Sequence, residues 1–497
     1  MSVPATVDSQ AQQDDVIAGQ LVDGQWEPAA AGEWIDIESP RDKAIIGRVP
    51  RARAEDVARA VRAARAAFPG WRDLAPRARG RMLLDIAAAL DSERERIARL
   101  LSLENGNALR TQSRGEVAFA ADTFRYFGGL ASEAKGESMP LSAGVLDYSR
   151  REPYGVVGAI VPWNAPVQLA AMKIAPALAL GNTLVLKAAE AAPLAVLLLS
   201  RLAAGQLPPG VLNVLTGYGD EAGEALTHHP GIDKISFTGS TAVGSRVLTA
   251  AAERIVPVSL ELGGKNPQIV FPDADEDWVA DGVIAGMRFF RQGQSCTAGS
   301  RLFVHRTILD SFVAKLTGRL SQLLVGDPLD ERNDIGAIVN RKQFDRVCGY
   351  IEDGLAQDGV GVALGGLPPA NGPLAGGYYV TPTVLTNVHN SWRIAQEEIF
   401  GPVVCAIPWE DEDDVLAQAN DSRYGLSAFV WTHDLGRALR AAHRVNAGWV
   451  QVNQGGGQVL GQSYGGYKRS GMGREFSLEG AVESYTQNKH ISVNIQR

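Results

Sequence analysis

The sequence has little cysteine and no long apolar run. Its 497 residues include three cysteines, Cys296, Cys348 and Cys405, which give neither a disulfide framework nor a paired spacing of metal ligands. Runs such as 194–199 fall far short of the roughly 20 apolar residues that span a bilayer. Residues 1–15 are polar and acidic, and they lack the basic-then-apolar order of a signal peptide. We therefore expect a cytoplasmic protein without a membrane partner.

Basic residues are also in deficit. The net charge of −8 and the pI near 5.5 argue against nucleic acid as a partner. No His-Glu-x-x-His or paired-cysteine pattern occurs, so we expect no metal. None of the seven histidines has a motif that would pair it with a cysteine, as a cysteine protease or esterase requires. The hydrophobic content of 45% is ordinary for a globular protein, and the length predicts two or three domains.

Short apolar runs alternate with Ala/Leu-rich segments after Gly155, which is typical of βαβ units. The buried parallel strands are expected at 156–161, 183–186, 211–215 and 234–237. The helices are expected at 53–68, at 79–103 with an end near Gly106, at 169–180 and at 194–204. A second α/β block is expected from residue 259, with strands at 268–270 and 301–305. Two strand-like segments, 144–153 and 489–495, fit neither block, and we expect residues 1–16 to be disordered.

Cys296 lies in the run Phe-Phe-Arg-Gln-Gly-Gln-Ser-Cys-Thr-Ala-Gly-Ser-Arg over residues 289–301. A thiol among small and hydroxyl residues is accessible to a substrate, and sulfur is a strong nucleophile that is partly ionised near neutral pH. A buried structural cysteine is the alternative for any single cysteine. The other motifs of the chain favour the nucleophile.

Seven motifs occur in a fixed order along the chain. They are Val161-Pro162-Trp163-Asn164, Lys187-Ala188-Ala189-Glu190, Phe237-Thr238-Gly239-Ser240-Thr241, Glu261-Leu262-Gly263-Gly264-Lys265-Asn266-Pro267, the Cys296 run, Glu397-Glu398-Ile399-Phe400-Gly401-Pro402 and Gly465-Gly466-Tyr467-Lys468. With these motifs the chain resembles the NAD(P)-dependent aldehyde dehydrogenase superfamily, in its hydrolytic rather than its CoA-acylating form. The resemblance extends from about residue 18 to the C-terminus.

The resemblance implies an α/β fold with two Rossmann-like domains, one cofactor-binding and one catalytic, and a small β oligomerisation arm. The implied segments are an NAD-binding domain at 17–129 and 154–258, a catalytic domain at 259–453, an arm at 130–153 and 476–497, and a substrate and anchor loop at 454–475. The arms of such proteins pair between subunits, so a homodimer or homotetramer is implied. A long strand with an unpaired edge also favours a partner.

The resemblance also assigns the catalytic roles. Cys296 attacks the aldehyde to form a thiohemiacetal, and Asn164 with the backbone N–H of Cys296 stabilises the oxyanion. Glu261 activates the water that hydrolyses the thioester. Lys187 is a further candidate, because its ammonium near the thiol would favour the thiolate. Alternatives remain open: a strand-end salt bridge for Glu261, a helix cap before Pro166 for Asn164, and a surface ion pair with Glu190 for Lys187.

Two glycine-rich segments could contact a nucleotide. Residues 217–223 nearly match a dinucleotide fingerprint, with one residue too many, and 239–244 have P-loop spacing without its Lys-Ser/Thr. A helix starting at Gly239 and Ser240 favours a pyrophosphate in either case. Glu190 would accept both ribose hydroxyls and repel a 2′-phosphate, so we expect NAD rather than NADP. The cofactor residues, most of them implied by the resemblance, are Ile160, Val161, Trp163, Lys187, Glu190, Gly223, Gly239, Ser240, Gly244, Leu262, Glu398 and Phe400.

The expected substrate pocket has fewer aromatic side chains than is usual in the family. Its residues are Ala165, Gln168, Met172, Phe290, Ser295, Thr297, Gln458 and Tyr464. Small or flexible residues in place of rings leave volume, so we expect a bulky aldehyde, unless loops refill the space. Arg291 replaces a frequent asparagine and either attracts a carboxylate on the substrate or, as we expect, faces solvent.

Two alternative functions stay open. A CoA-acylating semialdehyde dehydrogenase would release the thioester to CoA, but that route needs no hydrolytic base such as Glu261. A catalytically silent binding or structural relative is disfavoured because Cys296, Glu261 and Asn164 are all present. The identity of the aldehyde does not follow from the sequence.

Overall fold

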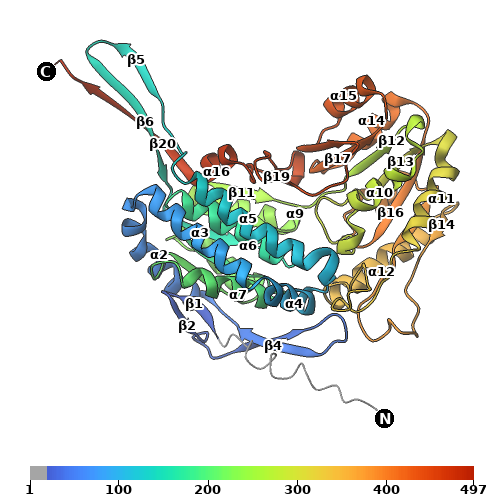
Figure 1. The fold of residues 1–497 in the computed structure, drawn as a ribbon, viewed down its shortest axis with the longest axis horizontal. Coiled ribbons are helices and arrows are strands. Elements are labelled where there is room, and N and C mark those ends of the chain that lie inside the picture. Colours follow the sequence, from blue (N-terminus) through green and yellow to red (C-terminus); the bar gives the residue numbers. More distant parts are fainter. Residues whose placement is uncertain (1–18, 497) are drawn as a thin grey trace.

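Two largely parallel sheets with helices on their faces organise the chain (Figure 1). The computed structural model describes residues 19–496, so the predicted disorder of residues 1–16 lies outside the described part. The first sheet has the strand order β19-β11-β10-β7-β8-β9-β1-β2. Its strands are β1 (Gln20–Val22), β2 (Gln25–Glu27), β7 (Val156–Ile160), β8 (Thr183–Lys187), β9 (Leu212–Leu215), β10 (Lys234–Thr238), β11 (Val258–Glu261) and β19 (Gly471–Met472).

The central strands of this sheet, β7 to β11, run parallel, as their apolar composition predicts. Around them pack α2 (Ala54–Asp73), α3 (Pro76–Ser92), α4 (Arg94–Asn105), α5 (Arg114–Leu130), α6 (Pro166–Ala179), α7 (Leu194–Ala204), α8 (Glu224–His228) and α9 (Thr241–Arg254). The helix predicted at 79–103 is in fact two helices, because the backbone leaves helical geometry at Glu93. The predicted end near Gly106 is confirmed, since Gly106 is the left-handed cap of α4.

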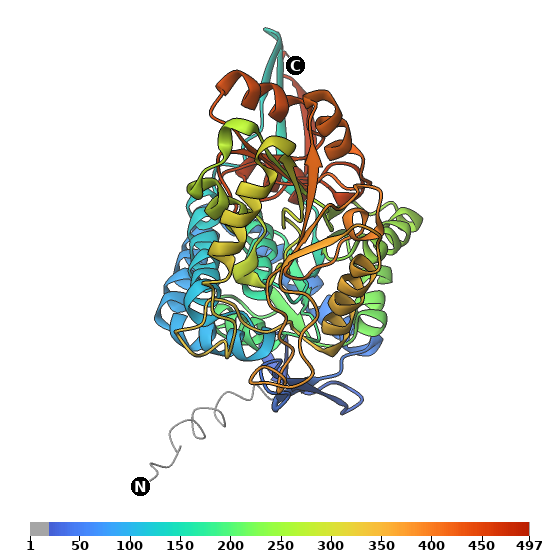
Figure 2. The same ribbon diagram turned by 90° about the vertical axis from the view of Figure 1, so that its right-hand side faces the viewer.

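The second sheet has the strand order β14-β15-β16-β13-β12-β17-β18. Its strands are β12 (Pro267–Val270), β13 (Arg301–His305), β14 (Gly361–Leu364), β15 (Thr383–Thr386), β16 (Val403–Trp409), β17 (Ser427–Trp431) and β18 (Trp449–Val452). Its helices are α10 (Asp277–Gly286), α11 (Leu309–Leu320), α12 (Arg341–Leu355), α13 (Arg393–Gln396), α14 (Glu412–Asn420) and α15 (Leu435–Arg444). In the side view of Figure 2 these elements, coloured yellow to orange-red, lie largely in front of the first sheet.

Two predicted boundaries need correction. The catalytic domain was expected to begin at residue 259, but that residue lies inside β11, which hydrogen-bonds to β10 in the first sheet. The change of sheet falls between β11 and β12. The arm was expected to include 476–485, yet these residues form α16 (Leu478–Tyr485) and its approach, and Phe476 and Tyr485 are buried in the body. Although α16 directly precedes the arm strand in the sequence, its apolar side chains pack into the body, so the helix belongs to the body and not to the arm.

The arm itself is a three-stranded sheet that projects from the body in both views (Figures 1 and 2). It consists of β5 (Ser138–Ser142), β6 (Val145–Pro153) and β20 (Thr486–Asn494), in the order β20-β6-β5. The two strand-like segments predicted outside both blocks are therefore paired with each other, as β6 and β20. A separate hairpin, β3 (Trp34–Glu38) and β4 (Ile45–Pro50), lies near the N-terminus.

The strand register brings together the residues that matter for function. Thr238 is opposite Glu261, and Ile160 is opposite both Phe237 and Lys187, so these strand ends form one edge of the first sheet. Ligands of open α/β sheets bind at this carboxyl edge. No helix between residues 19 and 496 is long and apolar enough to cross a membrane.

Candidate active site

Two cavities meet at Cys296. The larger has a volume of about 390 Å³ and the smaller about 180 Å³. The two cavities share five lining residues: Asn164, Leu169, Thr238, Glu261 and Cys296. The structure therefore brings together three of the predicted catalytic residues, which come from different elements, at the junction between two binding spaces.

A tight loop holds Cys296 at this junction. Gln292 and Gly293 both adopt left-handed backbone conformations, with φ of 52° and 64°, and the turn they make leads the chain back toward β13. The amide of Asn266 donates hydrogen bonds to the carbonyls of Cys296 at 2.8 Å and Ala298 at 3.0 Å. The backbone on the C-terminal side of the thiol is thereby fixed.

The surroundings of the Cys296 thiol favour its protonated form. Burial raises its pKa to about 12, and the nearby carboxyl groups of Glu398 and Glu261 act in the same direction. These surroundings oppose the thiolate that the nucleophilic role requires, although the residue as a whole is only half-buried. A hydroxyl group, that of Tyr464, lies 3.8 Å from Sγ.

Glu261 stands at the end of β11 and is buried. Within residues 19–496 neither of its carboxyl oxygens has a hydrogen-bond partner, so the alternative of a strand-end salt bridge is wrong. Burial raises its pKa well above the ordinary value, and the charge of Glu475 adds to this. A carboxylate with a raised pKa is a stronger base, which suits the activation of a water molecule.

Asn164 follows β7 and contacts the Cys296 loop. Its side-chain amide donates to the carbonyl of Gln294 at 3.0 Å. It does not cap α6: the carboxylate of Glu116 accepts from the backbone N–H of Val167 at 3.1 Å and of Gln168 at 3.4 Å instead. The amide is therefore beside the thiol loop, where the oxyanion role would place it.

Lys187 is not brought to the thiol. Its Nζ lies 2.7 Å from Oε2 of Glu190, and the residue lines neither of the two cavities. The lysine side chain is buried while that of Glu190 is 41% exposed, so this i,i+3 pair is anchored at the end of β8 and presents its carboxylate to solvent. The expected catalytic role of Lys187 beside Cys296 has no geometric support.

The smaller cavity is lined by six of the expected cofactor residues: Trp163, Gly239, Ser240, Leu262, Glu398 and Phe400. The rings of Trp163 and Phe400 meet edge to face with centroids 5.4 Å apart. Ser240 caps the N-terminus of α9, and Glu398 accepts from the backbone N–H of Gly264 at 3.0 Å. Burial raises the pKa of Glu398 to about 7.

The remaining expected cofactor residues lie outside the walls of this cavity. Ile160 ends β7 and Val161 follows it, and a Cβ on Gly223 would lie 3.9 Å from Cδ1 of Ile160. Gly244 packs against Leu262, where a Cβ would come within 2.4 Å of the leucine Cδ2. These residues shape the sheet edge rather than the cavity surface.

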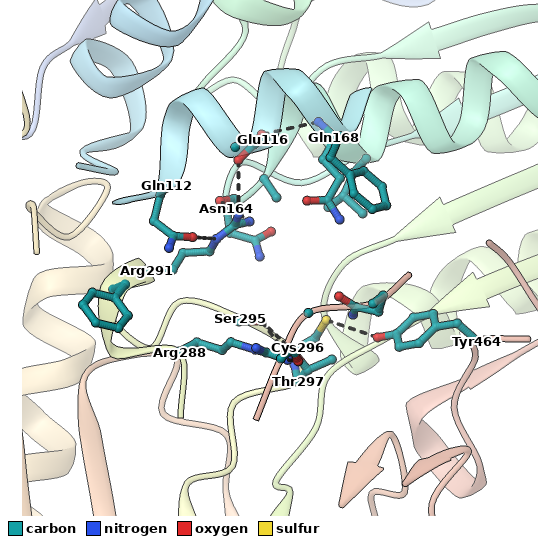
Figure 3. Close-up of a pocket in the computed structure, with 18 of the residues that line it drawn as sticks. Gln112, Glu116, Asn164, Gln168, Arg288, Arg291, Ser295, Cys296, Thr297 and Tyr464 are labelled. Atoms are coloured by element: carbon teal, nitrogen blue, oxygen red, sulfur yellow. Dashed lines mark hydrogen bonds and ion pairs between the residues drawn. The ribbon is translucent and has the colours of Figure 1, made fainter. Parts of the chain in front are cut away.

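The larger cavity, shown in Figure 3, contains seven of the eight expected substrate residues. They are Ala165, Gln168, Phe290, Ser295, Thr297, Gln458 and Tyr464. Met172 is the exception: it is buried in the core, and its sulfur accepts a hydrogen bond from the Thr123 hydroxyl at 3.7 Å. The prediction for Met172 is wrong because Met172 lies one helical turn beyond Gln168 in α6, past the end of the cavity and inside the core.

The larger cavity also has a polar wall that the sequence reading missed. Arg291 does not face solvent as expected; its side chain is 15% exposed and lies 3.5 Å from the carboxylate of Glu116. It also donates from Nε to the Gln112 side chain at 3.1 Å, and Figure 3 shows the guanidinium between these two residues. Glu116 lies at helical spacing from the buried Ala120 and Phe124. This spacing in the sequence could have indicated that Glu116 is buried on the same face of the helix.

Arg288 fixes the glycine loop that lines the cavity. Its guanidinium donates to the carbonyls of Gly455 at 2.9 Å and Gly456 at 2.7 Å, and to the Thr297 hydroxyl at 3.2 Å. Among the described residues it has no carboxylate partner. Burial lowers its pKa to about 10, so it remains charged at neutral pH.

A buried ion pair lies behind Glu261. Lys173 and Glu475 contact each other with both side chains nearly inaccessible, so Glu475 belongs to a structural ion pair. Lys234 lies close by and donates to the Ser259 hydroxyl at 2.7 Å. Burial and the charge of Lys173 lower the pKa of Lys234 to about 7. Within the described part of the chain, no cluster of His, Cys, Asp or Glu could hold a metal ion.

The sequence matches the aldehyde dehydrogenase family over residues 26–491. An acetaldehyde dehydrogenase of Pseudomonas aeruginosa is 40% identical over 96% of this chain and 94% of that protein. An NAD+ complex of aldehyde dehydrogenase from Bacillus cereus has a TM-score of 0.94 and 36% identity, covering 100% of both chains. An NADP-dependent enzyme of E. coli has a TM-score of 0.93 and 36% identity over 97% of this chain and 99% of that one. The chain therefore belongs to the aldehyde dehydrogenase family.

Proposed function

We propose that this protein oxidises an aldehyde to a carboxylic acid with NAD, using Cys296 as nucleophile and Glu261 as the base for hydrolysis. The observation that carries the proposal is the junction of the two cavities. Cys296, Glu261 and Asn164 line both of them, so a substrate in one space and a cofactor in the other would meet at the thiol.

The smaller cavity and the adjoining sheet edge fit NAD. Ser240 at the N-terminus of α9 would lie beside the pyrophosphate, and the exposed carboxylate of Glu190 would accept the ribose hydroxyls. Glu398 and Phe400 would hold the nicotinamide end, because both line the cavity next to Cys296. When bound, NAD supplies a hydride acceptor. The relatives include both NAD and NADP users, and the Glu190 carboxylate supports NAD because it would repel a 2′-phosphate.

The chain's own residues supply the rest of the chemistry. After the Cys296 thiol loses its proton to solvent, Sγ bonds to the aldehyde carbon. The amide of Asn164 and the Cys296 backbone N–H stabilise the oxygen that becomes negative. After oxidation the acyl group remains as a thioester on Cys296. Glu261 then takes a proton from the attacking water, and the thiol is released with the carboxylic acid. The unpartnered carboxyl oxygens of Glu261 leave it free to do this.

The substrate that the larger cavity favours is a bulky aldehyde. Its volume of about 390 Å³ lies within the range of ligand pockets for small organic molecules. Ala165 and Gln168 line it where a ring would reduce the volume, and Phe290, Phe119 and Phe476 provide apolar surface. This preference would set the protein apart from its relative named for acetaldehyde.

Self-association through the arm is also proposed. Both edge strands of the arm, β5 and β20, have one side unpaired in the isolated chain. Met139 and Leu141 on β5 are 48% and 59% exposed, which is unfavourable unless another surface covers them. A second copy of this chain would cover them.

NADH formation over a panel of aldehydes tests the function, with NAD or NADP and with or without CoA, in wild type and Cys296→Ala. We expect activity with NAD that needs no CoA and falls at least about 10⁴-fold in the variant. A strict need for CoA would instead show the acylating route. No activity across the panel with NAD binding retained would favour the silent relative.

A further inference from the structure

The hydroxyl of Tyr464 is in contact with the nucleophilic sulfur. Its oxygen lies 3.8 Å from Sγ of Cys296, within hydrogen-bond range for sulfur, and Figure 3 marks this contact. We propose that the Tyr464 hydroxyl is the hydrogen-bond donor that stabilises the Cys296 thiolate. The inference rests on the proposed role of Cys296 as the nucleophile.

Tyr464 is held in place from three sides. Its backbone N–H donates to the carbonyl of Glu475 at 3.1 Å, and the N–H of Glu475 donates back at 2.7 Å. The ring packs against Phe476 at 5.0 Å and Trp449 at 6.0 Å between centroids. The residue is 4% exposed, so the ring and its oxygen are held beside the sulfur. Such a donor loses little entropy when it binds the thiolate.

The thiolate needs a donor because its surroundings oppose it. The charged or titratable groups around the sulfur are Glu398 and Glu261, which disfavour a negative charge, and Arg288 and Tyr464, which favour it. The donors of Arg288 are directed at Thr297 and the carbonyls of the glycine loop, so Arg288 contributes through its charge alone. Tyr464 is therefore the one direct side-chain donor to the sulfur among the described residues.

The proton stays on the tyrosine oxygen. Burial raises the pKa of Tyr464 well above its ordinary value, and the neighbouring Cys296 and Glu261 act in the same direction. A phenol that does not ionise donates a hydrogen bond without accepting or losing a proton. The hydrogen bond from Tyr464 keeps the pKa of Cys296 lower than burial alone would leave it. Phenylalanine would keep the ring and remove the donor.

The test is the rate of Cys296 alkylation by iodoacetamide as a function of pH, without cofactor, in wild type and Tyr464→Phe. Below the thiol pKa the rate follows the thiolate fraction. Losing a hydrogen bond to a charged group should raise that pKa by about one unit and lower the rate about tenfold at each pH. The matched control is Tyr467→Phe, a tyrosine in the same loop that is 47% exposed and lines neither cavity. Its rate should equal that of wild type.

Equal rates for Tyr464→Phe and wild type would overturn the proposal. Where Tyr464→Phe does not fold, 3-fluorotyrosine at position 464 replaces it, because a more acidic hydroxyl is a stronger donor. A faster alkylation then supports the proposal, and an unchanged rate contradicts it. Alkylation reports on the thiol without turnover, so it is independent of the NADH assay. Activity surviving in Cys296→Ala would refute the proposed function. The alkylation rates would still show whether Tyr464 stabilises the Cys296 thiolate.

Discussion

The two cavities share a wall at Cys296 but are lined by different kinds of secondary structure. The walls of the smaller one come mainly from strand ends: Trp163 follows β7, Gly239 follows β10 and Leu262 follows β11. The larger one is lined by the facing sides of α5 and α6 and by the loops at 288–297 and 455–458. Backbone hydrogen bonds of the sheet position the first set of residues, whereas side-chain packing and side-chain hydrogen bonds position the second. Cofactor binding and substrate choice should therefore respond separately to mutation.

Glu261→Gln should have the largest effect, because Glu261 belongs to both cavities. We expect kcat to fall by about 10² to 10⁴, while one equivalent of NADH still forms in the first turnover. Stopped-flow absorbance separates the burst from the steady state. The exposed carboxylate in Glu479→Gln is the control and should leave both phases unchanged. Loss of the burst together with the steady state would place Glu261 before thioester hydrolysis.

Ala165→Phe should act on the larger cavity alone. A ring at this position fills volume next to Cys296, so kcat/KM for benzaldehyde-sized substrates should fall by about 10- to 100-fold. The KM for NAD should not change, since Ala165 does not line the smaller cavity. Acetaldehyde serves as the internal control, because it needs little of that volume. A wild-type enzyme that prefers acetaldehyde over larger aldehydes would contradict the bulky-substrate proposal.

Glu190→Gln should act on the cofactor alone. Removing the charge removes the repulsion of a 2′-phosphate, so kcat/KM for NADP relative to NAD should rise about tenfold. The KM for the aldehyde should stay the same, which steady-state kinetics with both cofactors would show. Glu253→Gln, at an exposed carboxylate in α9, is the matched control. An unchanged cofactor ratio would mean that Glu190 does not approach the ribose.

Glu398→Gln should give the smallest effect and measures the electrostatic link between the cavities. The pKa of Glu398 is raised to about 7, so the group is neutral below that pH and negative above it. Its negative charge disfavours the Cys296 thiolate. The variant should therefore be alkylated a few-fold faster at pH 9 and at nearly the wild-type rate at pH 6. Equal acceleration at both values would contradict an effect of charge.

Sequence reading was most successful where hydrogen-bonded geometry determines position. Strands β7 to β10 lie within a residue or two of their predicted ranges, and Glu261 and Asn164 lie beside Cys296 as motif order implied. In a parallel sheet, hydrogen bonds to the neighbouring strands determine where each strand ends. The family resemblance added the order of the motifs, which periodicity alone does not supply.

The errors fall where side-chain packing decides. Met172 lies on the same side of α6 as the cavity residue Gln168 but one helical turn further along, where the side chain is buried in the core. Lys187 pairs with Glu190 instead of approaching the thiol. Arg291 looked exposed because its partners, Gln112 and Glu116, come from a segment some 175 residues earlier in the sequence. No local pattern reveals a contact of that separation.

The most direct test of the thioester mechanism is mass spectrometry of Glu261→Gln after mixing with benzaldehyde and NAD. We expect an acyl adduct that maps to the peptide containing Cys296, forms in step with the first equivalent of NADH and disappears slowly. If the variant produces NADH and benzoate without any adduct on Cys296, both claims are contradicted: that a thioester forms on Cys296, and that Glu261 is needed for its hydrolysis.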